Sequence, residues 1–126
     1  MPSASKDEVA VTEAVEGYEG RMAEWGDFTA TFWSVAKGTD LSPFLKGLPD
    51  DRCPIPHYGF LFKGQMRIRY ADREETVTAG QAFYAPSGHI PVFDEDCEML
   101  EFSPTVEMQK AAAVIEKKLE AMDTQP

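Results

Sequence analysis

Apolar and polar residues alternate along many short segments of the chain, a pattern that is typical of β-strands with one buried face. Glycine, proline or charged clusters separate these segments at intervals of roughly 8 to 12 residues. Such regular spacing is typical of a β-sandwich or barrel. We predict strands over residues 18–22, 28–35, 58–62, 66–70, 76–78, 82–85, 92–93 and 98–102.

The period changes near the C-terminus, where apolar residues follow one another at steps of three and four, as in an amphipathic helix. Serine is a good helix cap and proline suits the first turn, and Ser103 and Pro104 precede this pattern. We therefore predict a helix over residues 105–122 that packs one stripe on the barrel or on a partner. The residues of the stripe are Met108, Ala111, Ile115, Leu119 and Met122.

Two stretches lack either period. Residues 1–14 are small or charged, and we predict a flexible N-terminal tail there. Residues 41–56 contain four prolines, which cannot occupy a central strand, so we predict a loop that leads into the next strand. A chain of 126 residues is the size of one domain, so residues 15–104 form the predicted barrel and residues 105–122 the helix.

Charge excludes one class of partner. The chain carries 22 acidic and 12 basic side chains, a net charge of −10, and such a field repels nucleic acid. Arg67 and Arg69 alternate with apolar residues, which indicates the solvent face of a strand rather than a basic patch. No apolar run approaches the roughly 18 residues of a membrane span, and no signal-type run begins the chain. We expect a cytoplasmic protein with no membrane partner, in which Cys53 and Cys97 are free thiols.

The two histidines of the chain lie in the centre of the strand-rich region, each beside proline and glycine. The two segments are His57, six residues and Gly64, and then Gly80, five residues, Pro86, one residue, Gly88 and His89. Their spacing resembles the two sequence motifs of small single-domain cupins, and the resemblance covers roughly residues 51–104. It implies a cupin jelly-roll barrel, so the expected fold class is all-β with a C-terminal α-helix.

The resemblance also implies a set of metal ligands. In metal-binding cupins the first motif supplies two histidines and a glutamate, and the second supplies a third histidine. Here these positions hold Asp51, Cys53, His57 and Pro91, while His89 lies two residues before the last of them. Two residues along a strand keep the same face, so we expect His89 to point into the barrel. The candidate ligands are therefore Asp51, Cys53, His57 and His89.

The chemistry of these residues suits a divalent transition metal. A thiolate with two imidazoles favours Zn²⁺, and Fe or Cu is also possible. In a straight strand Cys53 and His57 would lie about 13 Å apart, so a bend at Pro54 and Pro56 is required. In the alternative interpretation Cys53 is a small buried apolar residue, and both histidines form hydrogen bonds without a metal. In a further alternative Cys53 and His57 are a nucleophilic pair, but no third orienting residue is evident.

The cupin resemblance leaves the activity open. In the first hypothesis the ion acts on a small organic molecule at the barrel mouth, as Lewis acid or oxygen-activating centre of an isomerase or dioxygenase. In the second hypothesis a metal-free pocket only binds or senses a small molecule, and in a third the chain is a structural dimer. A homodimer is expected because small cupins commonly form one. Glu98 and Glu101 are candidate general bases, although a single carboxylate on a strand usually faces solvent. The expected pocket residues are Tyr58, Phe60, Phe62, Tyr84 and Phe93.

Overall fold

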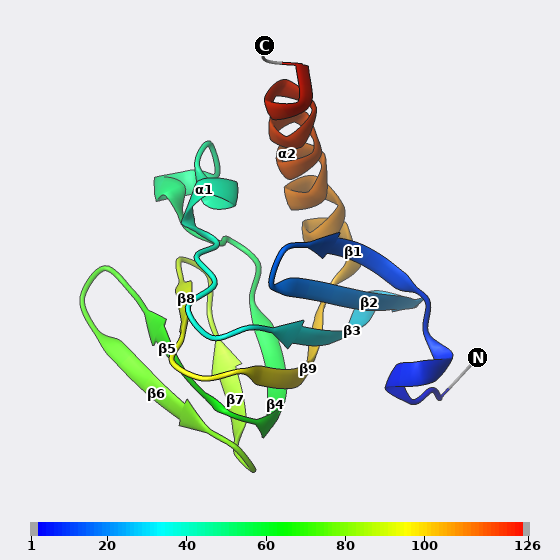
Figure 1. The fold of residues 1–126 in the computed structure, drawn as a ribbon, viewed down its shortest axis with the longest axis vertical. Coiled ribbons are helices and arrows are strands. Elements are labelled where there is room, and N and C mark those ends of the chain that lie inside the picture. Colours follow the sequence, from blue (N-terminus) through cyan, green and yellow to red (C-terminus); the bar gives the residue numbers. More distant parts are fainter. Residues whose placement is uncertain (1–2, 125–126) are drawn as a thin grey trace.

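The computed structural model describes residues 3–124, and along the C-terminal helix it describes side chains as far as Val114 and that of Lys117. In this part of the chain antiparallel strands dominate, with short helical turns before and between them and one long helix after them (Figure 1). The elements are η1 (Lys6–Glu8), β1 (Val11–Val15), β2 (Tyr18–Trp25), β3 (Phe28–Val35), α1 (Ser42–Leu45), η2 (Pro49–Asp51), β4 (His57–Lys63), β5 (Gln65–Arg69), β6 (Glu74–Thr78), β7 (Ala82–Ala85), β8 (Ile90–Phe93), β9 (Cys97–Pro104) and α2 (Thr105–Thr124).

The strands form two antiparallel sheets. The larger sheet has the order β1-β2-β3-β9-β4-β7, and the smaller has the order β6-β5-β8 (Figure 1). The late strand β9 lies between β3 and β4, so the chain returns to pair with two segments that are far away in sequence. This confirms the predicted all-β jelly-roll fold with a C-terminal helix.

The main core consists of the residues that alternate strands turn inward. Leu61 of β4, Met66 and Ile68 of β5 and Met99 of β9 are all at most 4% exposed and belong to one apolar cluster. Neighbouring residues of the same strands point to the opposite face, as the pleat requires. The inner side of the larger sheet is therefore set by this alternation.

A second apolar cluster joins the loop of residues 41–56 to the C-terminal helix. Leu45, Leu48 and Ile55 of the loop pack with Ala111 of α2, and Met108 lies against them. The predicted helix stripe is confirmed for Met108 and Ala111, while the side chains of Ile115, Leu119 and Met122 lie outside the described residues. Within residues 3–124 no helix combines the length and apolar character needed to cross a membrane.

Part of the predicted N-terminal tail, residues 1–14, has regular secondary structure. Residues 11–15 form β1, an edge strand paired with β2. Before it, the Lys6 ammonium lies 2.9 Å from the Glu98 carboxylate and holds η1 against the sheet. Four of the five β1 residues are exposed, so this strand has no buried face and therefore no alternation of apolar and polar residues that the sequence could reveal.

Candidate metal centre

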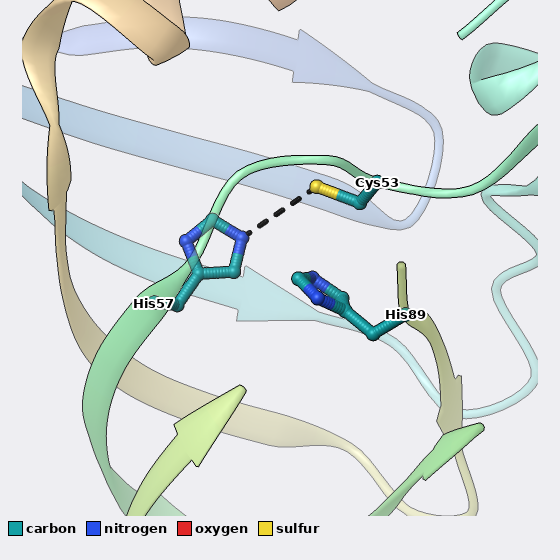
Figure 2. A group of neighbouring side chains, drawn as sticks. All are labelled: Cys53, His57 and His89. Atoms are coloured by element: carbon teal, nitrogen blue, oxygen red, sulfur yellow. Dashed lines mark hydrogen bonds between the residues drawn. The ribbon is translucent and has the colours of Figure 1, made fainter. Parts of the chain in front are cut away.

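Three candidate ligands converge inside the barrel from three different segments (Figure 2). Cys53 lies on the loop before β4, His57 begins β4, and His89 directly precedes β8. One ligand atom from each residue lies within 4.8 Å of the others. The two imidazole ring centres are 4.9 Å apart, although 32 positions separate the histidines in sequence. The prediction that both histidines lie together inside the barrel is confirmed.

The chain bends sharply between Cys53 and His57, as the prolines predict. Cys53 Sγ lies 3.7 Å from His57 Nε2, far closer than a straight strand would allow. The backbone fixes this bend, because Cys53 N–H donates to the His89 carbonyl at 2.9 Å and Gly88 N–H donates to the Cys53 carbonyl at 2.8 Å. The loop cysteine is thus held beside the second histidine.

Hydrogen bonds orient both imidazole rings. His89 Nδ1 lies 2.8 Å from the Pro86 carbonyl oxygen, which can only accept, so this nitrogen carries the proton and Nε2 keeps a free lone pair. His57 Nδ1 lies 2.6 Å from Ser103 Oγ, and its Nε2 faces Cys53. Histidines that bind metals are usually anchored in this manner through their second nitrogen.

Burial keeps all three candidate ligands uncharged at neutral pH. It lowers the pKa of His57 to about 4, and burial together with the neighbouring His57 lowers the pKa of His89 to about 4. Burial raises the pKa of the Cys53 thiol to about 12. The imidazoles are therefore ready to bind a cation, whereas the thiol has to release its proton when a cation binds.

Glu101, one of the two candidate general bases in the sequence, is a buried residue of this site. Its carboxylate lies 4.0 Å from His57 Nδ1, and it is only 8% exposed. Burial raises its pKa to about 7, and the nearby His89 and the hydrogen bond from Trp33 oppose this rise. The alternation along β9 could have revealed this burial, because Glu101 and the apolar Met99 are two residues apart and lie on the same face.

Ser103 also belongs to the site rather than to a helix cap. It is 1% exposed within β9, and its hydroxyl contacts His57 instead of the first turn of α2. Thr31, opposite Glu101 on β3, is fully buried, and among the described residues its hydroxyl has no hydrogen-bond partner. The inner side of the larger sheet is therefore polar near the histidines.

Asp51 does not join the group, contrary to the sequence prediction. Its carboxylate accepts a hydrogen bond from Gly47 N–H at 3.0 Å, and the residue is exposed. Asp50 and Asp51 adopt positive φ angles of 58° and 53°, so the backbone turns here in a left-handed conformation. The aspartate closes this turn, while the metal-capable set is Cys53, His57 and His89.

Most of the aromatic residues predicted to line a pocket inside the barrel point to its outside instead. Because His57 points inward, the alternate residues of β4 point outward, and the adjacent β7 follows the same rule. Phe93 is 5% exposed and packs in the main core. The four aromatic side chains that lie outside, each at least 38% exposed, are Tyr58, Phe60, Phe62 and Tyr84.

Other aromatic rings lie on the inner side. Phe83 lies over Gly59 and Trp33 lies over Gly20, and a Cβ atom at either glycine would overlap the ring. Tyr18 packs against Trp33 with ring centres 4.9 Å apart. These rings, which pack against the main core, had no distinguishing signal in the alternating pattern.

Comparison with known proteins gives structural neighbours only. No family model matches the chain, and no curated protein matches it either. An RmlC-like cupin from Shewanella frigidimarina matches with a TM-score of 0.60 and 14% identity, covering 81% of this chain and 89% of that chain. KdgF from a Halomonas species matches with a TM-score of 0.52 and 16% identity, covering 79% of this chain and 92% of that chain. HppE in its apo form matches with a TM-score of 0.57 and 13% identity, covering 79% of this chain and 56% of that chain. An Fe(II) form of HppE also matches.

Proposed function

The chain has the cupin fold, and we propose that its barrel binds one divalent transition metal ion through Cys53, His57 and His89. A small organic molecule then binds beside the ion. The observation that carries this proposal is that one ligand atom from each of the three residues lies within 4.8 Å of the others. The hydrogen bond from His89 Nδ1–H to the Pro86 carbonyl supports it, because it leaves Nε2 without a proton. The Fe(II) form of HppE, a protein of the same fold, supports a metal in such a barrel.

The spacing of the donor atoms fits an ion. Ligands about 2.0 to 2.3 Å from a tetrahedral ion lie roughly 3.3 to 3.7 Å apart, and the Cys53 sulfur and His57 Nε2 are 3.7 Å apart. The remaining ligand atom lies within 4.8 Å of both, and small side-chain rotations would bring it within range. One thiolate with two neutral imidazoles favours Zn²⁺, while Fe and Cu stay within the proposal. Three protein ligands leave one position open, as in catalytic zinc sites.

The surrounding residues have separate roles in this proposal. When bound, the ion supplies Lewis-acid polarisation of a small molecule at its open position. Pro86 and Ser103 hold the two imidazoles in orientation. Glu101 offers a carboxyl group beside His57, and Thr31 offers a buried hydroxyl opposite it. A bound molecule with complementary polar groups would satisfy both of these side chains.

Metal content tests the proposal directly. We expect protein purified without an affinity tag or chelator to hold about one equivalent of a transition metal by elemental mass spectrometry. Cys53→Ser and His57→Ala should each lose it. The matched control is Cys97→Ser, because Cys97 is a second free cysteine outside the group. Wild-type protein that retains less than about 0.2 equivalents after dialysis against Zn²⁺ or Fe²⁺ would leave the metal-free binding module as the better hypothesis.

A further inference from the structure

The charged residues on the inner side of the larger sheet all carry the same sign. Strand register places Glu13, Glu24 and Glu101 on this side, each directly opposite an inner-side residue of the next strand. The six strands of this sheet, all within the described residues, contain two basic residues, Arg21 and Lys63. Both lie opposite residues of the outer side. The inner side therefore carries acidic charge only.

Basic residues of the neighbouring segments have partners elsewhere. Arg52, next to Cys53 on the loop, donates to the Arg69 carbonyl of β5 at 3.4 Å. Arg67 of β5 pairs with Asp94 at 3.0 Å on the exposed side of that strand. The strands and the Cys53 segment therefore present no side-chain cation to a carboxylate or phosphate beside the proposed ion.

Glu101 is the inner-side glutamate that lies against the candidate metal ligands. Its carboxylate is 4.0 Å from His57 Nδ1, whereas Cys53 faces the Nε2 atom of the same ring (Figure 2). An ion held by Nε2 and the thiolate would therefore lie across the imidazole from this carboxylate. A molecule that occupies the open position on the ion and extends past the ring would meet Glu101 with its other end.

Two neighbouring side chains indicate that a polar group is missing beside Glu101. Thr31, directly opposite on β3, is 0% exposed, and among the described residues its hydroxyl has no hydrogen-bond partner. A buried hydroxyl without a partner is unfavourable. Trp33 donates one hydrogen bond to Glu101, which leaves other acceptor positions of the carboxylate unfilled. A ligand with several N–H donors would satisfy both oxygen-bearing side chains.

We propose that the small molecule of this site is an organic amine, whose ammonium group donates to Glu101 and Thr31 while its other end reaches the ion. The inference rests on the proposed function, because it names the ligand class of the same site. An organic acid would instead bring a like charge to Glu101. Tyr18 and Trp33, whose ring centres are 4.9 Å apart on the same side, add aromatic surface that attracts cations.

The electric field of the whole chain favours the same class of ligand. The net charge of −10 attracts cations and repels anions. Acidic groups also reach the edge of the sheet, where Glu13 of β1 accepts a hydrogen bond from the Tyr18 hydroxyl at 3.1 Å. An amine would therefore be attracted to this side of the sheet, and an organic acid would be repelled.

Three probes of similar size and shape test the ligand class. Isopropanolamine, propylene glycol and lactate carry an ammonium, a hydroxymethyl or a carboxylate group on the same hydroxyethyl frame. Ligand-observed NMR titration of the Zn²⁺-loaded protein measures the affinity of each. We expect isopropanolamine to bind at least roughly tenfold more tightly than lactate, with the glycol between them, because hydrogen bonds to charged groups are the stronger ones.

Two variants connect this preference to the named residues. Glu101→Gln keeps nearly the same shape without the charge, so it should bind isopropanolamine no more tightly than propylene glycol. Glu95→Gln, in the exposed turn before β9, makes the same change of charge and is the matched control. Thr31→Val removes the buried hydroxyl and should weaken amine binding about fivefold. It decides the question even if circular dichroism shows that Glu101→Gln fails to fold.

Metal content, measured in the same samples, separates this inference from the proposed function. Ion-loaded protein that binds lactate as tightly as isopropanolamine, or that binds no isopropanolamine at millimolar concentration, refutes the ligand class alone. A preference for the amine that Glu101→Gln and Thr31→Val both leave unchanged refutes it as well. Protein that holds no ion refutes the metal site, and this inference with it.

Discussion

The two faces of strand β4 both depart from the usual rule for a sheet with one solvated side. The inner face presents the buried imidazole of His57 before the apolar Leu61, whereas the outer face presents exposed rings such as Tyr58 and Phe62. Soluble antiparallel sheets normally turn apolar residues inward and polar ones outward. The comparison teaches that the inner face of this strand joins a buried polar residue to the apolar core, while its outer face is aromatic and exposed.

The largest expected effect is a difference in stability between substitutions at neighbouring residues on the two faces. Leu61 is 0% exposed in the main core, and Phe62, the next residue, is 53% exposed. Leu61→Ala should lower the free energy of unfolding by about 3 kcal/mol, because it leaves a cavity. Phe62→Ala should cost less than about 1 kcal/mol by urea denaturation at the same low protein concentration. Equal losses for the two variants would contradict the assignment of the faces.

Metal-linked stability should depend on the inner face alone. A ligand at 100 times its dissociation constant stabilises a folded protein by about 2.7 kcal/mol, so Zn²⁺ should raise the melting temperature and a chelator should lower it again. Cys53→Ser should abolish this response, and Tyr58→Ser on the outer face should retain it. The measurement is calorimetry of each protein with and without the ion. A Zn²⁺ response that survives in Cys53→Ser would place the ion elsewhere.

The inner face should also make the stability of the metal-free protein depend on pH. Folding lowers the pKa of both histidines from 6.5 to about 4. Their contribution to the free energy of unfolding is therefore complete above pH 6.5 and is lost as the pH falls towards 4. Folding raises the pKa of Glu101 from 4.5 to about 7, so its contribution is lost in the opposite direction, as the pH rises. Between pH 5 and 6 the unfolded protein binds more protons at the histidines than the folded protein, and fewer at the glutamate, with a net difference of about one proton. The free energy of unfolding should therefore rise by about 1 kcal/mol per pH unit.

A glutamine variant isolates these opposing contributions. Glu101→Gln removes the opposing group and should steepen the slope of stability against pH, whereas His89→Gln should flatten it. Urea denaturation at pH 5 and pH 6 measures both slopes. Outer-face variants such as Tyr84→Ser should leave the slope unchanged, and a slope of zero in wild-type protein would refute the buried, neutral state of the histidines.

The smallest expected effect concerns the residue that orients His57. Ser103→Ala removes the hydroxyl that contacts His57 Nδ1 at 2.6 Å and should cost about 1 kcal/mol of unfolding free energy. It should also weaken metal binding about tenfold, as loss of a residue that orients a ligand usually does. Competition with a zinc indicator measures the affinity. Ser87→Ala, in an exposed turn, is the control, and equal affinities for the two variants would show that Ser103 has no orienting role.

Local patterns in the sequence predicted most of the strands and the fold. The predicted ranges 28–35 and 82–85 coincide with β3 and β7, because alternation and turn residues are local signals. The motif spacing around His57 and His89 also located all three members of the convergent group, Cys53 included. A strand with little buried surface, such as β1, gives no alternation and could not be found in this manner.

The errors have a common physical origin. Alternation shows that neighbouring residues occupy opposite faces, but it does not show which face is inside when both carry aromatic and polar groups. That ambiguity misplaced Tyr58 by one face and left open which face carries Glu101. Asp51 was misplaced for another reason, because a left-handed turn is decided by backbone contacts that ligand spacing does not report.

If the proposed ion is bound, the position of Cys53 on a loop would also affect how quickly that ion exchanges. Cys53 packs against the second apolar cluster, in which Leu48 and Ile55 of the loop contact Ala111 of α2. An ion held by this cysteine would leave only when the loop separates from the helix, so its residence time would follow the frequency of that local opening. Substitution of Ala111 would then change the rate of metal release without touching any ligand.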